Sequence, residues 1–453
     1  MNLSTQRLAF AIGTRAWRVV YNLVAIPTLF FSVPLLALLP ARSGALLKIR
    51  NGVRGRKGWY ESLRAQLQPY SNERPRVWIH AASMGECEQA KPILRELGAR
   101  LPHAVRVLTI FSPSAMRHIT RENFPAEAIC YLPFDSLLQV RKFFNAVQPS
   151  AGVVIRHDYW PNFMWEAKRR GVHLLLADAS VSANANSFRH KPLVRNFNRE
   201  VLAQFDTIAA VSAFAAENLR PLLRYPERLR VLGDTRYEQV LHRVQHAAPQ
   251  NILPPSWSEQ KFHLVAGSTW PADEEVLIPA FAAARERFPY VRMILVPHEP
   301  TATHLQNTER LLHEYRLASV RLSHAHQHEA AEVLLVDRIG VLAELYGSGQ
   351  IAYVGGAFGP GVHSVLEAAA HGVPVLFGPR HHNSAEAVEM AQSSCGKMVS
   401  NREECARALE QLWLNEKLRA EQGRACRAFV EQKTGAAQAM VSLLASEKSI
   451  NRL

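Results

Sequence analysis

Two carboxylates, Glu86 and Glu88, stand where a predicted strand runs into a predicted helix, in the segment WIHAASMGECEQAKP at residues 78–92. The apolar run before them is typical of a buried strand, and the apolar residues after them recur at helical spacing. Pro92 is expected in the first turn of that helix, where its missing N–H costs no hydrogen bond. The loop therefore lies at the carboxyl end of a strand, where open α/β sheets bind ligands. Carboxylates there either serve a ligand site or are ordinary acidic residues favoured by a helix N-terminus, and the segment alone leaves both open.

A glycine-rich segment at residues 351–379, IAYVGGAFGPGVHSVLEAAAHGVPVLFGP, reads as strand, loop, helix, glycine stop and strand. Glycines in the loop would let backbone N–H groups approach a ligand, and a helix expected to begin near His363 would direct its positive end at the same place. That arrangement suits an anion such as a phosphate, and Glu367 could accept hydrogen bonds from ribose hydroxyls. The spacing is not the dinucleotide G-x-G-x-x-G, and a tight turn with structural glycines is the competing interpretation. The loop glycines are Gly355, Gly356, Gly359 and Gly361.

Four more loops with polar or small residues follow predicted strands. VAGSTWPADEE brings small and hydroxyl residues, VPHEP places His298 and Glu299 at a strand end, and GDTRYE places Arg236 near a predicted hinge. IRHDYWPN places Asp158 and Trp160 at a loop tip. Each loop alone is weak evidence. Together, the six loops fall on the edges where parallel sheets bind ligands, which indicates a functional site.

The elements that must position these residues alternate between strands and helices along the chain. Buried strands are predicted in RVWIHAA, AVRVLTIFS, AICYLPF, AGVVIR, VHLLLADAS and TIAAVS, and a second series follows in FHLVAGST, VRMILVP, EVLLVD, IAYVGG and VPVLFGP. Such βαβ series imply parallel sheets. The fold class is therefore α/β, with two doubly wound, Rossmann-like halves that we expect to face each other across a cleft. The expected divisions are residues 1–55 as an N-terminal anchor, 56–240 and 261–453 as the two halves, and 241–260 as a polar, proline-bearing linker.

Composition narrows the class of protein. A chain of 453 residues with 48% hydrophobic residues is expected to hold two to three domains with sizeable cores. Five cysteines, an odd number without metal-type spacing, argue against a disulfide scaffold and favour a reducing compartment. Residues 1–68 hold ten Lys/Arg against one acidic residue, Glu61, so much of the net charge of +14 is concentrated there. A nucleic-acid binder would more often carry basic residues across its folded part, so nucleic acid is not an expected partner.

The basic N-terminal residues flank an apolar segment at residues 19–39, VVYNLVAIPTLFFSVPLLALL. Its length is close to the ~20 residues that span a bilayer, although two prolines would kink it. A single span, a kinked segment lying in the interface and an uncleaved signal-like anchor remain open, and all three place the protein at a membrane. Basic residues nearby would then contact anionic headgroups, each contributing about 1 kcal/mol. A buried hairpin of core helices is the alternative.

These motifs, in this order, resemble the Kdo transferases, the family that attaches 3-deoxy-D-manno-octulosonic acid (Kdo) to a lipid A precursor. HAASMGE is similar to the family's H-A-x-S-x-G-E, YLPFD to its Y-L-P-x-D, and DYWPN to its E-x-W-P-N. VAGSTW, VPHEP and the segment from DRIGVLAELYGSG to VPVLFGP look like its donor-binding half. The resemblance covers most of the chain from GRKGWYESL onward. It implies the glycosyltransferase B fold.

The resemblance also implies residue roles. Glu86 takes the place of the general base that deprotonates the acceptor hydroxyl, and Asp158 and Arg236 take positions thought to stabilise the transition state. Glu88 is expected to be only an exposed residue at the helix start. Three departures from the family stand out: Asp158 replaces the usual Glu, Arg236 stands where many members have Lys, and PGVHSVLE replaces GGHNPLE. The positions where the family holds CMP are Pro297, His298, Ile339, Gly340, Val341, Ser364, Val365, Leu366 and Glu367.

The resemblance implies an inverting transfer of Kdo from the donor CMP-Kdo to a lipid A precursor, at the cytoplasmic face of the cell inner membrane. No cofactor or metal is expected, since no Asp-x-Asp pair occurs in a metal-binding context. Anionic lipids of the inner membrane are expected partners. Two alternatives stay open: another membrane-associated two-Rossmann glycosyltransferase that uses a different nucleotide sugar, and a catalytically silent lipid-binding scaffold on the same fold. Donor-specific binding would separate the first, and any turnover would exclude the second.

Overall fold

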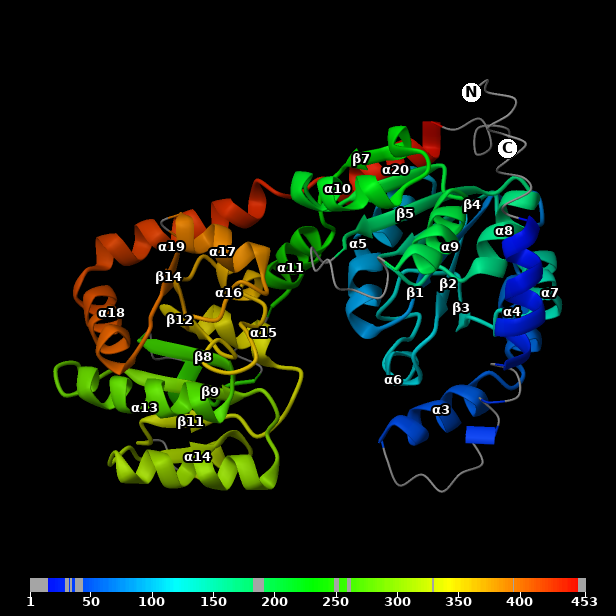
Figure 1. Cartoon of the computed structure of the whole chain (residues 1–453). Helices are drawn as coiled ribbons and strands as arrows, with labels where there is room; N and C mark the ends of the chain where they lie inside the picture. The colour runs from blue at the N-terminus through cyan, green and yellow to red at the C-terminus, as the bar shows by residue number, and fades with distance from the viewer. Residues whose placement is uncertain are drawn as a thin grey trace. The chain divides into compact units, whose positions relative to one another are not determined.

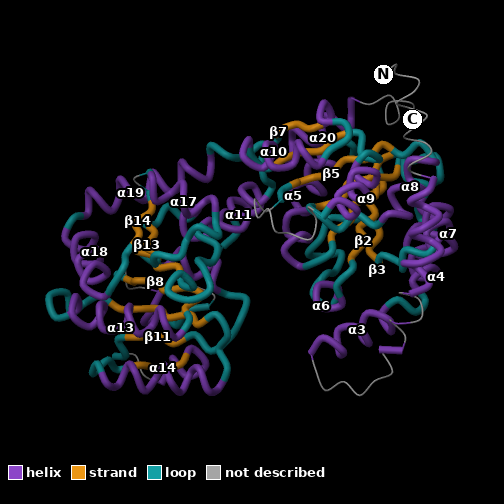
Figure 2. The backbone as a smooth tube through the Cα atoms, in the orientation of Figure 1, coloured by secondary structure: helices purple, strands orange, loops and turns teal. Residues whose placement is uncertain are grey.

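The structure is a computed structural model (Figure 1), and it describes residues 15–28, 32, 35–36, 44–181, 191–247, 252–258, 262–327, 330–393 and 395–446. The chain forms two compact units. Unit 1 contains the residues up to Gln239 together with those from Gly435 onward, and unit 2 contains Val240–Thr434. Each unit is built around one seven-stranded parallel sheet, drawn in orange in Figure 2.

The sheet of unit 1 has the strand order β3-β2-β1-β4-β5-β6-β7. The chain runs outward from β1 on one side and from β4 on the other, so the strand order reverses between these two neighbours. In doubly wound sheets the crevice at this reversal is where ligands bind. The strands are β1 (Arg76–Ala81), β2 (Val105–Ile110), β3 (Ala128–Tyr131), β4 (Ala151–Ile155), β5 (His173–Ala179), β6 (Thr207–Ala210) and β7 (Leu229–Val231).

Helices cover both faces of this sheet, because the side chains that the strands direct to each face are mostly apolar. One core contains Trp78 with Phe143, Phe144 and Phe163, from α7 and α8. The other core contains Val77 and Ile79 with α5 and α20. The helices of unit 1 are α3 (Gly44–Gly55), α4 (Trp59–Leu67), α5 (Met84–Arg100), α6 (Pro113–Met116), α7 (Leu137–Val147), α8 (Pro161–Arg169), α9 (Pro192–Leu202), α10 (Ala213–Leu219) and α20 (Ala436–Ser446), with short 3-10 turns η3 (Arg220–Leu222) and η4 (Pro226–Arg228).

The sheet of unit 2 has the order β10-β11-β9-β8-β12-β13-β14 and reverses between β8 and β12. Its strands are β8 (His263–Thr269), β9 (Arg292–Pro297), β10 (Ser319–Arg321), β11 (Val333–Leu335), β12 (Ile351–Val354), β13 (Val375–Phe377) and β14 (Gly396–Met398). Its helices are α12 (Pro255–Ser258), α13 (Pro271–Arg285), α14 (Ala302–Glu314), α15 (Leu342–Leu345), α16 (Leu366–Ala370), α17 (Ala385–Gln392), α18 (Arg402–Leu414) and α19 (Glu416–Glu431), with η6 (Leu322–Gln327) and η7 (Tyr346–Ser348); α11 (Arg236–Gln245) begins in unit 1.

Two expected divisions of the chain differ from the structure. Residues 435 onward lie with unit 1 and not with the C-terminal half, because Met440, Val441 and Leu444 of α20 are buried in the core beside α5. Residues 252–258 of the expected linker are folded with unit 2. Trp257 there is fully buried, and Arg292 lies 4.8 Å from its ring centre.

Two expected helix starts are also wrong. Helix α5 begins at Met84, so Pro92 lies in its interior and not in its first turn. The start is set by Ser83, which caps the helix. The helix expected near His363 begins at Leu366 and has five residues.

The described N-terminal residues 15–28 are helical, with a π-helical stretch η1 (Tyr21–Ala25). Tyr21 donates a hydrogen bond to the buried Asp135 (2.9 Å), and Trp17 and Tyr21 pack against the core of unit 1. Val19, Val20, Leu23 and Val24 are 49–72% exposed. Among the described residues, no helix has the length and apolar character needed to cross a membrane, so the expected spanning segment at 19–39 has no support there; part of it lies outside the described residues.

Candidate active site

Glu86 lies where the unit 1 sheet reverses, at the third position of α5. Its Oε2 accepts hydrogen bonds from the amides of Ala82 (2.7 Å) and Ser83 (2.9 Å), and the Ser83 hydroxyl accepts from the Glu86 amide (3.4 Å). This is a capping box, which fixes both the helix start and the carboxylate. Both amides donate to Oε2, and no donor among the described residues is bonded to Oε1. Glu86 is therefore both the helix-start residue and a carboxylate with one oxygen available to a substrate.

Asp158 follows β4, the neighbour of β1, so it lies on the same edge of the sheet as Glu86. Its Oδ2 accepts hydrogen bonds from His80 Nε2 (2.9 Å) and from the Trp160 indole (3.2 Å). On the other side of the His80 ring, Nδ1 lies 3.1 Å from the Thr109 carbonyl oxygen and 3.0 Å from the Thr109 hydroxyl oxygen. These contacts hold the His80 ring between Asp158 and Thr109.

The charge of Asp158 is also balanced by Arg56. Burial raises the pKa of Asp158, but the hydrogen bonds from His80 and Trp160 and the charges of His80 and Arg56 outweigh it, so that pKa lies below its ordinary value. The Arg56 guanidinium is 7% exposed and donates to the carbonyls of Leu132 (2.8 Å), Gly52 (2.9 Å) and Phe111 (3.0 Å). Aromatic rings surround it at 4.5–5.1 Å, and burial lowers its pKa to about 10.

Arg236 is the first residue of α11, and its side chain lies on Asp234. Its Nε and Nη2 donate to Asp234 Oδ2 at 2.9 and 2.7 Å. The same turn is attached to α5, since the Thr235 hydroxyl lies 2.9 Å from the Gln89 carbonyl oxygen. Arg236 is thus connected to the helix that begins with Glu86. The structure gives no direct contact between Arg236 and either Glu86 or Asp158.

Glu88 differs from expectation. It is half-buried, bound by the Lys91 ammonium (2.7 Å) and by the Gln239 amide (2.6 Å). Lys91 lies one turn further along α5, and Gln239 lies on α11. Glu88 therefore attaches α5 to α11 and is not a freely exposed residue.

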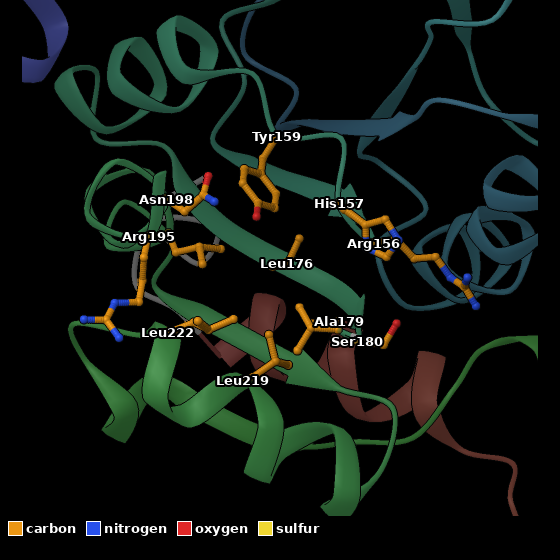
Figure 3. Close-up of a pocket in the computed structure, with 12 residues that line it drawn as sticks. Arg156, His157, Tyr159, Leu176, Ala179, Ser180, Arg195, Asn198, Leu219 and Leu222 are labelled. Atoms are coloured by element: carbon orange, nitrogen blue, oxygen red, sulfur yellow. The ribbon is translucent and has the colours of Figure 1, made fainter. Parts of the chain in front are cut away.

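A small pocket of about 20 Å³ lies beside the Asp158 loop in unit 1 (Figure 3). Its floor is apolar, with Leu176, Leu219 and Leu222, and Tyr159 points toward Leu176. Arg156 and Arg195 contribute to its wall, but Figure 3 shows their guanidinium groups directed away from the centre. The pocket is thus an apolar recess next to the loop that carries Asp158.

In unit 2, three rings stack where the sheet reverses. The His298 ring lies 4.2 Å from His363 and 5.2 Å from Trp270, with interplanar angles of 20° and 18°. The Trp270 indole donates to His363 Nε2 (2.9 Å). Burial and the neighbouring charge of His298 lower the pKa of His363. Pro297 ends β9 directly before this stack, so the predicted donor residues Pro297 and His298 lie together with Trp270.

The glycine-rich loop does not present its glycine amides to a ligand, in contrast to the sequence prediction. Asp273 accepts the amides of Gly356 (2.7 Å) and Phe358 (3.3 Å), and the other loop glycines donate to backbone carbonyls. A Cβ at Gly355 would lie 2.4 Å from the Ser268 oxygen, so this glycine permits close packing. The competing interpretation, structural glycines in a tight turn, describes these four residues.

The remaining predicted donor residues fall in two loops. Ile339 is 79% exposed, Gly340 has φ +89°, and Val341 caps α15. Ser364 is exposed, Val365 caps α16, and Leu366 is buried. Glu367 lies 3.8 Å from Arg243 in an ion pair. Both loops follow the carboxyl ends of strands of unit 2. Among the described residues, no group of three or more His, Cys, Asp or Glu side chains is arranged to hold a metal ion.

Comparison with known proteins shows which family the chain is similar to. Residues 52–239 match the family model described as 3-deoxy-D-manno-octulosonic-acid transferase (kdotransferase). The chain is 26% identical over 377 residues to the 3-deoxy-D-manno-octulosonic acid transferase of Haemophilus influenzae, covering 81% of this chain and 86% of that protein. It is 27% identical over 344 residues to the Aquifex aeolicus transferase of the same name, covering 74% and 85%. The chain is thus similar to the Kdo transferases over most of its length.

Solved structures show the same fold. The crystal structure of UDP-GlcNAc 2-epimerase from Neisseria meningitidis superposes with a TM-score of 0.62 at 13% identity, covering 82% of this chain and all of that one. A glycosyltransferase from Rickettsia africae gives 0.54 at 12% identity, covering 82% and 98%. At such identities the likeness concerns the fold alone. The scaffold of the chain is therefore two parallel-sheet α/β domains of the glycosyltransferase B type.

The sequence prediction omitted two residues that organise the site. His80 lies inside the HAASMGE motif, and a histidine near the end of a buried strand was its only signal. Asp273 lies in the first turn of α13 and binds amides more than 80 residues away in the sequence. The contacts of His80 with Asp158 and of Asp273 with the glycine-rich loop depend on the strand order, so the sequence alone could not identify them.

Proposed function

We propose that this protein transfers Kdo from CMP-Kdo to a lipid A precursor, with Glu86 as the general base. Similarity to the Kdo transferases is the observation that carries the proposal. It is supported by a carboxylate, Glu86, and a hydrogen-bonded pair, His80–Asp158, at the reversal of the unit 1 sheet.

In the proposed reaction the acceptor hydroxyl oxygen attacks the anomeric carbon of Kdo as the bond to the CMP phosphate breaks. Oε1 of Glu86 takes the hydroxyl proton, while Oε2 stays bound to the amides of Ala82 and Ser83 and holds the base in place. Asp158 remains ionised and, with Arg236, supplies fixed charge near the reacting atoms.

For the donor, we propose that CMP binds at the reversal of the unit 2 sheet. The stacked rings of Trp270, His298 and His363 supply an aromatic surface and ring nitrogens next to the predicted CMP residues. The amides of Ser364 and Val365 have no acceptor among the described residues and are suited to a phosphate, and Glu367 is suited to ribose hydroxyls.

The donor assignment is tested by titrating the full-length protein with CMP, UMP and UDP. Cytosine carries an exocyclic amino group, a hydrogen-bond donor, where uracil carries a carbonyl oxygen, an acceptor. We therefore expect CMP to bind at least tenfold more tightly than either uridine nucleotide. Stronger binding of UDP would favour a transferase for a different nucleotide sugar.

We further propose that the protein acts at the cytoplasmic face of the inner membrane, held by its N-terminal helix. Trp17 and Tyr21 attach this helix to unit 1, whereas Leu23 and Val24 are 72% and 61% exposed. Such exposed apolar side chains, next to a basic segment, suit binding to anionic lipids.

The membrane proposal is tested by replacing both Leu23 and Val24 with serine. We expect the variant to co-sediment with anionic vesicles at least tenfold less than the wild type, with unit 1 still folded. Leu193→Ser is the control, because Leu193 on α9 is also 72% exposed. Equal sedimentation of wild type, double variant and control would exclude this role for the helix.

A further inference from the structure

A buried polar cluster lies beneath the start of α11, and the proposed mechanism uses none of its carboxyl groups. Asp178 on β5 is fully buried, and Asp234, two residues before Arg236, is 3% exposed. The Gln89 amide of α5 bridges them, 3.2 Å from Asp178 Oδ2 and 3.4 Å from Asp234 Oδ1. Two buried carboxyl groups around one amide cannot both be ionised without a large cost.

The donors and acceptors around the Thr235 hydroxyl require one proton on the carboxyl groups of Asp178 and Asp234. The Thr235 hydroxyl lies 2.9 Å from the Gln89 carbonyl oxygen and 2.5 Å from Asp178 Oδ2. A hydroxyl has one hydrogen, and both a carbonyl and an ionised carboxylate only accept. Both contacts are satisfied together when Asp178 is protonated and donates to Thr235, which donates to Gln89. The Thr235 amide donates to the other oxygen, Oδ1 (3.0 Å), which leaves Oδ2 for the proton.

Asp234 keeps its charge because Arg236 binds it. The Arg236 amide donates to Asp234 Oδ1 (2.9 Å), and its guanidinium donates twice to Oδ2. Burial raises the pKa of Asp234, but the Arg236 contacts and the Arg156 charge hold it below its ordinary value. Burial and the Asp234 charge raise the pKa of Asp178 to about 7 against the Thr235 bonds and Arg156.

The other charged groups around the pair are few. The Arg156 guanidinium, after β4, faces both carboxyl groups, and Glu238 on α11 faces Asp234. Figure 3 shows Arg156 extending away from the pocket. Asp178 itself has φ +52°, a left-handed conformation that is strained for a residue other than glycine. Such strain persists where surrounding bonds fix the residue, which agrees with a built arrangement.

We infer that Asp178 and Asp234 form a carboxyl pair that holds one proton, carried by Asp178, and that this pair positions the Arg236 side chain. Loss of the proton removes the bond from Asp178 to Thr235 and places a second negative charge beside the partner of Arg236. The proton count stands on the contacts alone, while the consequence for catalysis rests on the proposed function, in which Arg236 takes part.

The proton is tested directly by infrared spectroscopy of the full-length protein at neutral pH. We expect Asp178→Asn to remove one protonated-carboxyl band from the wild-type spectrum. Asp206→Asn is the control, since Asp206 is in a surface ion pair with Lys168 and should leave that band unchanged. An unchanged carboxyl band in Asp178→Asn would overturn the inference.

A second readout is stability against pH. Because the pKa of Asp178 is raised on folding, the extra stability of the protonated form is complete below the unfolded value of about 3.9 and is lost as pH rises to about 7. The unfolding free energy of the wild type relative to Asp178→Asn should therefore fall across this window and level off above it. A difference that rises with pH would contradict the assignment.

The positioning role is tested by activity. In the wild type, kcat should fall above about pH 7, where Asp178 loses its proton. Asn reproduces the shape and donor of the protonated acid, so Asp178→Asn should keep kcat within about threefold at neutral pH and should not show this fall. Asp178→Leu should lower kcat at least tenfold, since Thr235 loses its partner. A kcat for Asp178→Asn as low as for Asp178→Leu would overturn the positioning role. If the spectroscopic and stability results hold but the wild type transfers no Kdo, the proposed function fails and the protonated pair stands.

Discussion

At the residue scale, the site is defined by two carboxylates, Glu86 and Asp158, that have different hydrogen-bond partners. Glu86 is bound through one oxygen by two amides, and Asp158 is bound by His80 and Trp160. Asp158 is bound by His80 and lies near the charge of Arg56, whereas no cation contacts Glu86 among the described residues. An environment of this kind suits a base at Glu86 and a permanent negative charge at Asp158.

Glu86→Gln should lower kcat about 10²–10⁴-fold with little change in KM, because the basic oxygen is lost. The fold should be retained, since glutamine also forms a capping box. Steady-state kinetics and thermal unfolding measure the two effects. The control is Glu88→Gln, which weakens only the contacts with Lys91 and Gln239. A nearly normal kcat for Glu86→Gln with an inactive Glu88→Gln would move the base to Glu88.

Asp158 gives a prediction for acid stability. Its pKa is lowered on folding, so it contributes stability that is present above the unfolded value of about 3.9 and is lost as pH falls through the folded value. Urea unfolding should show the advantage of the wild type over Asp158→Asn shrinking below about pH 4. An advantage that grows on acidification would show that His80 does not stabilise the ionised form.

The activities of two Asp158 variants separate the effect of the side chain's charge from that of its shape. Asp158→Asn should lower kcat, because the site loses a fixed negative charge and His80 loses a charged hydrogen-bond partner. Asp158→Glu, which restores the residue usual in the family that the sequence resembles, should be tolerated. Turnover numbers for the two variants decide this. Equal activity of Asp158→Asn and wild type would remove Asp158 from the mechanism.

At the scale of elements, the long buried strands and the helices between them could be predicted from the sequence. β1, β4 and β8 are buried strands rich in apolar residues, and the residues after them were correctly placed at strand ends. β7, β10 and β14 have three residues each, with few apolar positions, so no periodicity marks them. The joining of His80 to Asp158 depends on the pairing of β1 with β4, which local patterns do not contain.

The glycine-rich loop provides an element-scale prediction. Gly356 has φ +95°, and a Cβ there would lie 2.2 Å from the Gly361 oxygen, so Gly356→Ala should lower the unfolding free energy by at least about 1–3 kcal/mol. Gly359→Ala is the control, because its Cβ would have 3.7 Å to the nearest atom and should change stability by less than about 0.5 kcal/mol. Denaturant unfolding measures both. Equal losses would show that the turn is not fixed as described.

At the scale of the whole molecule, each unit contributes residues from the reversal point of its own sheet. Unit 1 carries Glu86, His80 and Asp158, and unit 2 carries the ring stack and the predicted CMP residues. Because the proposed acceptor chemistry lies in one unit and the proposed donor site in the other, neither unit alone is expected to catalyse transfer.

The measurement that tests the account most directly is the mass of the lipid product. The full-length protein is incubated with CMP-Kdo and a tetraacylated lipid A precursor in detergent, and the lipid is analysed by mass spectrometry, with Glu86→Gln as the matched control. The account predicts a mass increase of one or more whole Kdo residues with the wild type, and little or none with Glu86→Gln in the same time. An unmodified lipid with folded wild-type protein, or equal product from Glu86→Gln, would contradict it.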